Sequence, residues 1–187
     1  YQAELADEDE LYFFSGTKIE ESELLATGDD EFQPIYSPDG EKVGYIHNRH
    51  VVKVLDIESG ETVTVLDGTL FYSYADGDHW FRWSPDSEWL AVHFYDKGRI
   101  WAGEIGLVRA DGSTERPINL SESGYDDIAP PWGMDGGVVY WATDRYGEKA
   151  HGSWGGEHDI VGAFLTQDAY DRFRLTKEEY ELQKEME

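Results

Sequence analysis

The sequence predicts an all-β fold made of repeated four-stranded units. Nearly the same turn occurs at Ser37-Pro38-Asp39-Gly40 and at Ser84-Pro85-Asp86-Ser87, and a degenerate copy stands at Gly133-Met134-Asp135-Gly136. Successive copies begin 47 and 49 residues apart, and periods of about 40 to 50 residues are typical of the four-stranded blades of β-propellers. Aromatic-rich segments precede the turns and alternating or apolar segments follow them, as expected for strands joined by a tight turn. We therefore predict a β-propeller, as a partial ring of about three four-stranded blades with a short C-terminal helix.

The repeat divides the chain into five predicted parts. They are the end of a preceding blade (1–31), a blade (32–67), a second blade (68–120), an incomplete blade (121–167) and a helical exit segment or linker (168–187). The turn residues support the blades, because Pro sets φ at the second position of a tight turn and Asp with Gly or Ser completes it. In the exit segment, Thr176 is the expected N-cap and Glu179 its capping-box partner.

Strands are expected on both sides of each turn. Before the first complete blade the expected strands are 10–15 and 18–27. In the first complete blade they are 32–37, 42–47, 51–57 and 62–66, and in the second they are 80–84, 89–95, 105–110 and 116–120. In the third blade they are 131–133, 138–143 and 159–165, and the fourth strand of this blade is missing. Each blade of a propeller buries both faces against its neighbours. The ends of the partial ring, near Leu11–Phe13 and Val161–Phe164, are therefore expected to present apolar faces. We expect other parts of the same chain to cover these apolar faces; the alternative is that copies of the chain self-associate through them.

The composition restricts the class of partner. Forty Asp and Glu against fifteen Lys and Arg give a formal net charge of −25 at pH 7, which argues against binding to nucleic acid. The absence of cysteine excludes disulfides and thiolate chemistry. No apolar run reaches the 18 or more residues of a membrane span, so no membrane partner is expected. Because neither a signal peptide nor an initiator Met is visible, we expect a piece of a longer chain.

Four segments carry a resemblance to a known family. They are DGTLFYSYADGDHWFRWSPDSEWLAV (67–92), EIGLVRADGS (104–113), LSESGYDD (120–127) and HGSWGGEHDIVGAFLTQDAYDRFRLTKEEYEL (151–182). In this order they resemble the N-terminal propeller of tricorn-like serine peptidases of Bacteroidetes type, and the blade turns also resemble those of TolB-like propellers. The resemblance covers nearly the whole chain from about Gly28 onward.

The resemblance implies a non-catalytic role for this part of the chain. In that family the nucleophilic Ser and its helpers lie in a C-terminal peptidase region, so no catalytic residue is carried over and no cofactor is implied. The implied role is to gate or guide peptide substrates of the parent peptidase and to dock other domains of the same chain. A periplasmic or otherwise extracytoplasmic location is implied, with the cytoplasm as the alternative. The other functions considered are a stand-alone TolB-like or lectin-like binding propeller and an enzyme with its own site on the propeller face.

A glycine-rich loop supplies the first candidate binding residues, His151, Ser153 and Trp154. The loop reads HGSWGG and lacks the first Gly of the G-x-S-x-G nucleophile elbow, so Ser153 is not expected to be catalytic. We expect an ordered rim loop, with peptide contact as the alternative, because binding residues favour loops on a rigid scaffold.

Two acidic loops supply further candidates, Asp76 with Asp78 and Asp126 with Asp127. Both loops directly precede the first strand of a blade, and neither has the D-x-[DN]-x-[DN]-G pattern of a calcium loop. Asx-turns that cap the entering strand are the main interpretation. Capture of a cation or an amine is the alternative.

The tryptophans and histidines give weaker signals. Five tryptophans are expected to fill the wedge between blades: Trp80, Trp83, Trp89, Trp132 and Trp141. Trp101 and Trp154 fall in excursions, and Trp101 is therefore a further candidate for exposed binding. His47 and His50 lie three apart at a strand end, where successive side chains diverge, so no metal site is predicted.

Overall fold

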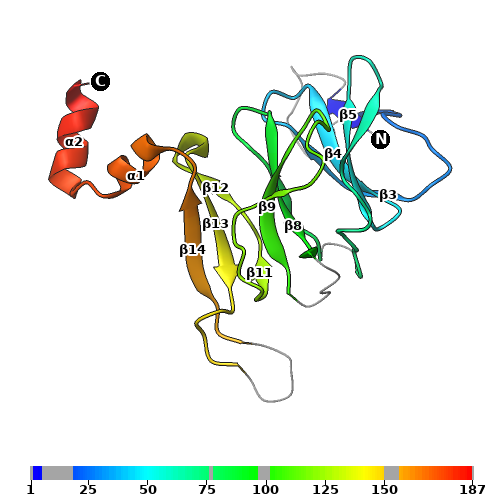
Figure 1. The fold of residues 1–187 in the computed structure, drawn as a ribbon. Coiled ribbons are helices and arrows are strands. Elements are labelled where there is room, and N and C mark those ends of the chain that lie inside the picture. The colour runs from blue at the N-terminus through cyan, green and yellow to red at the C-terminus, as the bar shows by residue number, and fades with distance from the viewer. Residues whose placement is uncertain (1, 6–18, 76–77, 97–101, 150–155, 187) are drawn as a thin grey trace.

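Three antiparallel sheets form most of the fold in the computed structural model, which describes residues 2–5, 19–75, 78–96, 102–149 and 156–186 (Figure 1). The first sheet holds β3 (Glu31–Tyr36), β4 (Lys42–His47), β5 (Val51–Asp56) and β6 (Thr62–Leu66). The second holds β7 (Phe81–Trp83), β8 (Trp89–Phe94), β9 (Glu104–Arg109) and β10 (Ile118–Asn119). The third holds β11 (Asp127–Ile128), β12 (Trp132–Gly133), β13 (Val138–Thr143) and β14 (Asp159–Phe164). The fold is all-β, and its sheets stand side by side as in a partial β-propeller.

The repeated turn connects strands in every sheet, as predicted. In the first sheet the Ser37 N–H donates to the Lys42 carbonyl at 2.9 Å, and in the second the Ser84 N–H donates to the Trp89 carbonyl at 2.8 Å. The serine hydroxyl of each turn also donates to the aspartate two residues later, so Ser and Asp close the turn together. The third copy differs and forms the short helical turn η3 (Met134–Gly136) between β12 and β13.

The core lies between the sheets and contains a repeated link. The largest buried cluster joins the first two sheets, and a second cluster joins the second and third. The Trp83 indole N–H donates to the Ile35 carbonyl at 3.0 Å, and the Trp132 indole N–H donates to the Arg82 carbonyl at 3.0 Å. Each tryptophan is the last aromatic residue before its turn, so the same residue position ties each sheet to the one before it.

Most of the tryptophans expected in the core are at least half-buried. Trp83 and Trp141 are 7% and 6% exposed, which confirms the core interpretation for these two residues. The side chains of Trp80, Trp89 and Trp132 are half-buried. Trp101 and Trp154 lie outside the described residues.

The third sheet is three strands wide, although it contains four strands. β11 and β12 pair with opposite ends of β13, where Asp127 faces Thr143 and Trp132 faces Val139. β14 pairs along the other edge of β13. β11 was not predicted from the sequence, and it forms where the long strand β13 offers an edge that β12 does not fill.

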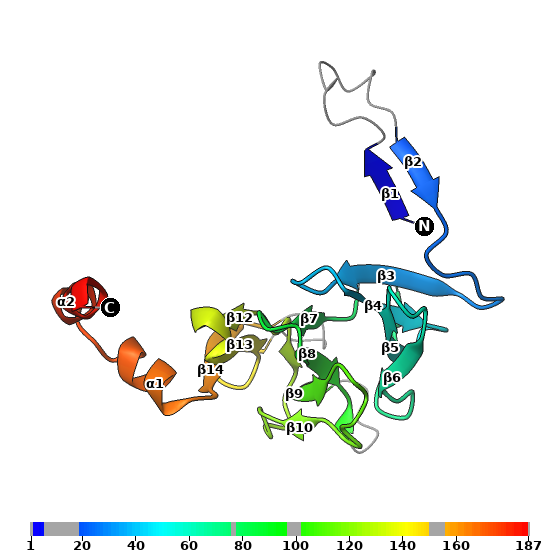
Figure 2. The same cartoon turned by 90° about the horizontal axis from the view of Figure 1, so that it is seen from above.

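The N-terminal strands differ from the prediction. β1 (Gln2–Leu5) pairs with β2 (Ile19–Ser22) in a hairpin that stands apart from the three sheets (Figure 2). A strand over 2–5 was not predicted, the predicted strand over 10–15 lies outside the described residues, and β2 is shorter than the predicted 18–27. The segment after β2 covers the outer face of the first sheet, because Leu24 and Leu25 pack on Val43, Tyr45 and Leu55.

The expected open face at β14 is only partly apolar and exposed. Val161 and Ala163 point toward the second sheet and pack in its cluster. Phe164 points the other way and contacts the Tyr170 and Phe173 rings at centroid distances of 5.4 and 5.1 Å. The remaining exposed apolar side chain of β14 is Ile160, at 72%. The sequence prediction placed Val161–Phe164 on a single apolar face. Because side chains alternate along a strand, these residues lie on opposite faces of the sheet.

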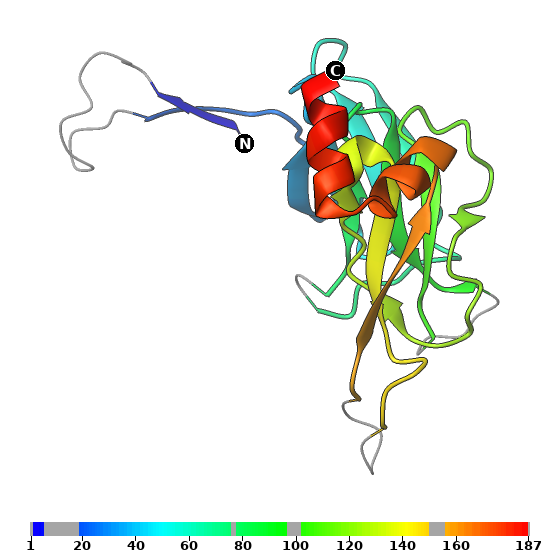
Figure 3. The same ribbon diagram turned by 90° about the vertical axis from the view of Figure 1, so that its left-hand side faces the viewer.

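The C-terminal segment forms two helices rather than one, α1 (Gln167–Phe173) and α2 (Lys177–Met186), which lie beyond the third sheet (Figure 3). Thr166 caps α1 by accepting the Ala169 N–H. The predicted capping box of α2 is confirmed, because the Thr176 N–H donates to the Glu179 carboxylate at 2.8 Å and the Thr176 hydroxyl accepts the Glu179 N–H at 3.3 Å. Neither helix is long and apolar enough to cross a membrane.

Candidate functional site

Three of the eight predicted candidate residues lie at the edge of the sheets opposite the repeated turns. We name this edge the loop edge; its described residues are 47–51, 67–75, 78–80, 94–96, 102–104, 120–127, 144–149 and 156–158. We name the opposite edge, with the turns and α1, the turn edge (Figure 1). Asp78, Asp126 and Asp127 are at the loop edge. Five other candidates lie outside the described residues: Asp76, Trp101, His151, Ser153 and Trp154.

Asp78 holds the loop before β7 in place. Its carboxylate accepts hydrogen bonds from the Ser73 hydroxyl at 2.8 Å and the Ala75 N–H at 2.7 Å, and also from the Tyr74 N–H. These contacts occupy both carboxylate oxygens within the loop. The contacts therefore give Asp78 a structural role, and its participation in binding stays a prediction.

Asp126 and Asp127 lie between the second and third sheets but have different surroundings. Asp126 accepts the Gly103 N–H at 3.4 Å, and its own N–H donates to the Asp144 carboxylate at 3.0 Å. Partial burial raises the pKa of Asp126, and the nearby Asp144 carboxylate raises it further. Asp127 is fully buried and accepts the Ser123 hydroxyl on Oδ2.

A small cavity with mixed polar and apolar lining adjoins Asp127. Its volume is about 110 Å³, and Thr143 and Arg145 are among its lining residues. The Oδ1 atom of Asp127 has no hydrogen-bond partner among the described residues. A buried carboxylate oxygen beside such a cavity is a usual place for an ordered water.

Two buried histidines at the loop edge were missed by the sequence reasoning. His79 and His93 are each 2% exposed, and their ring centroids are 5.5 Å apart. Burial lowers the pKa of His93 to about 4 and lowers that of His79 well below its ordinary value. His79 Nε2 and both ring nitrogens of His93 lack hydrogen-bond partners in the described part of the chain. The sequence signal for a buried His93 was its position within the otherwise apolar run LAVHF over 90–94, which the structure buries completely.

The pair His47 and His50 does not form a joint site. His47 Nδ1 lies 3.3 Å from Glu31 Oε1 and its Nε2 lies 3.8 Å from Asp29 Oδ2, whereas the His50 ring contacts the Asn48 carbonyl. Within the described ranges, no group of three or more His, Asp and Glu side chains is arranged to hold a metal ion.

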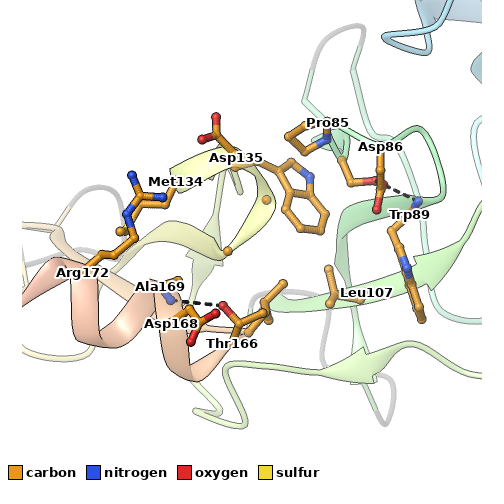
Figure 4. A pocket seen from close by; sticks show the side chains of 15 residues that line it. Pro85, Asp86, Trp89, Leu107, Met134, Asp135, Thr166, Asp168, Ala169 and Arg172 are labelled. Atoms are coloured by element: carbon orange, nitrogen blue, oxygen red, sulfur yellow. Dashed lines mark hydrogen bonds between the residues drawn. The ribbon is translucent and has the colours of Figure 1, made fainter. Parts of the chain in front are cut away.

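An apolar concave surface lies at the turn edge, as a groove between the second sheet, the third sheet and α1 (Figure 4). Its volume is about 490 Å³. Apolar side chains from all three elements line it: Pro85, Trp89, Leu107, Trp132, Met134, Leu165 and Ala169. The charged lining residues are Asp86, Asp135, Asp168 and Arg172. We name this surface the turn-edge groove. The sequence did not predict it, because it is formed only when α1 packs beside turns that lie far away in the chain.

The walls of the turn-edge groove are held by the fold. The indole N–H of Trp132 is bound to the Arg82 carbonyl, which fixes its ring, and the Arg109 guanidinium lies 4.9 Å from the Trp89 ring centroid. α1 packs closely on the third turn, because a Cβ built on Gly137 would lie 2.6 Å from the Ala169 Cβ. The groove is therefore a built feature of three packed elements.

The third turn has an unusual backbone at the groove. Met134 and Asp135 have φ of +50° and +53°, in the left-handed region that non-glycine residues rarely adopt. Such conformations cost about 1 kcal/mol or more per residue, and they concentrate at functional sites. The sequence signal was the change from Ser-Pro-Asp-Gly to Gly-Met-Asp-Gly.

Comparison with known proteins supports no assignment beyond fold. No protein-family model matches the chain, and no curated protein sequence matches it. Among solved structures, the chain is similar to tricorn protease, with 14% identity and a TM-score of 0.48 over 80% of this chain and 14% of that one. It is also similar to a protein assigned as TolB from Agrobacterium tumefaciens, with 16% identity and a TM-score of 0.41 over 80% of this chain and 62% of that one. The chain thus spans less than two thirds of either protein, and both are propeller-containing.

Proposed function

We propose that this chain is a non-catalytic β-propeller module that binds peptide segments at its turn edge. The observation that carries the proposal is the turn-edge groove, which is apolar, concave and built from three elements. Grooves of this kind, with apolar walls and a few polar groups, are the usual form of a ligand site. The sequence resemblance to tricorn-like serine peptidases supplies the context, in which the module guides peptides of the parent peptidase and docks its other domains.

Binding at the groove has a clear physical basis. Trp132 and Leu165 present apolar surface at an opening between rigid elements, and Leu165 is 37% exposed. Burying a leucine-sized side chain of a peptide there contributes about 1.5–3 kcal/mol. A module that binds through a few such contacts holds a passing peptide weakly and releases it, as a guiding role requires.

The experiment that tests the proposed function is a peptide-binding assay with paired variants. A panel of fluorescent pentapeptides that contain leucine should bind the protein and remain uncleaved. Leu165→Ser should weaken binding about tenfold, since it removes apolar surface from the groove wall. Leu182→Ser is the matched control, because Leu182 is 59% exposed on α2 and does not line the groove.

The outcomes separate the candidate functions. Equal binding by both variants and the parent protein would place any peptide site elsewhere and contradict the proposal. Binding of sugars instead of peptides would favour the lectin-like alternative. Peptide hydrolysis by the purified chain would favour an enzyme with its own site.

A further inference from the structure

We propose that the turn-edge groove selects peptides that present a lysine or arginine side chain beside an apolar residue, with the basic group held between the Asp135 carboxylate and the Trp132 ring. This inference rests on the proposed function, and it adds the chemistry of the ligand. Four features of the groove favour such a ligand: an available carboxylate, a negative local charge, an aromatic wall and a guanidinium donor.

The sequence change in the third turn releases a carboxylate. In the first two turns, Asp39 and Asp86 accept the hydroxyls of Ser37 and Ser84. The equivalent aspartate of the third turn is Asp135, and Gly133 stands where the serine would be. Asp135 therefore lacks the hydroxyl that occupies its counterparts, and it has no hydrogen bond or ion pair with any residue that the structure describes. Its exposed carboxylate at the groove is available to a ligand.

The local charge favours a cation. The groove contains three carboxylates, those of Asp86, Asp135 and Asp168, against the single guanidinium of Arg172. Asp86 is partly used, since it accepts the Ser84 hydroxyl and the Glu88 N–H at 3.0 Å. Asp168, like Asp135, has no partner in the described ranges. The formal charge of −25 on the whole chain adds a long-range attraction for basic peptides and repels acidic ones.

An aromatic wall lies next to the free carboxylate. Trp132 precedes the third turn by one residue, and its ring lines the groove while its N–H is bound to the backbone. A cation over a tryptophan face is stabilised by about 0.5–1 kcal/mol at exposed sites. The Arg109 guanidinium lies over the ring of the lining residue Trp89 in this way, at 4.9 Å, although Arg109 itself does not line the groove. A ligand cation at Trp132 would repeat this arrangement with Asp135 as its counter-ion.

The remaining lining fits the rest of a short peptide. Leu107, Leu165 and Ala169 provide an apolar surface for the neighbouring side chain. Arg172 of α1 also lines the groove, and its guanidinium can donate to a peptide carbonyl. The Arg172 guanidinium also lies 5.8 Å from the Tyr180 ring centroid.

The test compares three end-blocked, fluorescently labelled pentapeptides, Gly-Leu-Lys-Leu-Gly, Gly-Leu-Gln-Leu-Gly and Gly-Leu-Glu-Leu-Gly, by fluorescence anisotropy at low and high salt. The lysine peptide should bind most tightly and the glutamate peptide least. Asp135→Asn should weaken lysine-peptide binding about two- to fivefold and leave the glutamine peptide unchanged. This variant preserves the turn, because asparagine tolerates the left-handed region. The matched control is Glu58→Gln, which removes one negative charge from the turn after β5, outside the groove.

Each result decides between the two proposals. Equal affinity for the three peptides, or equal loss in the Asp135→Asn and Glu58→Gln variants, would overturn the charge selection while peptide binding stands. Absence of binding by all three peptides would overturn both proposals. Asp168→Asn serves as a second variant if Asp135→Asn fails to fold, and it should also weaken the lysine peptide selectively.

Discussion

Acidification from pH 7.5 to pH 5.0 should destabilise the protein through the buried histidine pair. Burial lowers the pKa of His93 from 6.5 to about 4, so the folded protein binds this proton more weakly than the unfolded chain does. The stabilising effect of the neutral ring is complete above pH 6.5 and is lost as the pH falls toward 4. At pH 5.0 the unfolded chain gains about 2 kcal/mol from protonation of this one site. His79, whose pKa is lowered in the same direction, adds to the loss.

A substitution isolates the contribution of His93. The His93→Leu variant lacks the titrating group, so its free energy of unfolding should fall by about 2 kcal/mol less than that of the parent protein between pH 7.5 and pH 5.0. The comparison cancels effects shared by both proteins, including the carboxylates with lowered pKa, such as Asp39, Asp86 and Asp111, which act mainly below this range.

Urea denaturation followed by tryptophan fluorescence at several pH values measures this difference. His158→Leu is the control, because His158 is exposed at the same edge and its replacement leaves the buried histidine pair intact. Parallel pH profiles for the parent protein and His93→Leu would refute the reasoning, and so would a measured His93 pKa near 6.5.

Three further predictions concern packing, the inter-sheet link and surface charge. Gly103→Ala should destabilise the fold by about 1–3 kcal/mol in the same urea assay, since the added Cβ would lie 1.8 Å from His93 Nε2 and the ring must shift. An unchanged urea midpoint would contradict the packing described for this site. Trp83→Phe should cost about 1 kcal/mol or more, because it leaves the Ile35 carbonyl without the indole donor, and a neutral result would show that the repeated link contributes little. The melting temperature should rise between low salt and 1 M NaCl, since screening shortens the range of the repulsion among the forty carboxylates to about 3 Å. An unchanged melting temperature would indicate that the surface carboxylates are well paired.

The repeat was readable from the sequence because its information is local. Pro and Asp fix the turns over four residues, and the strands beside them follow from alternation. The capping box at Thr176 and Glu179 is equally local and was predicted with its correct partners. The N-terminal hairpin was not predicted, since the strand Gln2–Leu5 has only four residues, QAEL, with Leu5 as its one large apolar side chain.

The candidate site was less readable because it depends on packing between distant segments. The turn-edge groove unites Trp89, Met134 and Arg172, which no sequence spacing relates. β11 also forms from tertiary context, because Asp127 and Ile128 pair with an edge that β13 provides. The sequence shows only that Gly133 stands where the first two turns have a serine. That this change leaves the Asp135 carboxylate without a hydroxyl partner follows only from comparing the three turns in the structure.

The most direct test of the central claim follows the indole N–H resonances of the tryptophans while the lysine pentapeptide is added to 15N-labelled protein. Trp89 and Trp132 line the groove, whereas Trp83 is buried between the first two sheets. The account predicts saturable shifts of the Trp89 and Trp132 signals with the Trp83 signal unchanged. Saturable binding that leaves the Trp89 and Trp132 signals in place, or that moves only signals from the loop edge, would contradict peptide recognition at the turn edge.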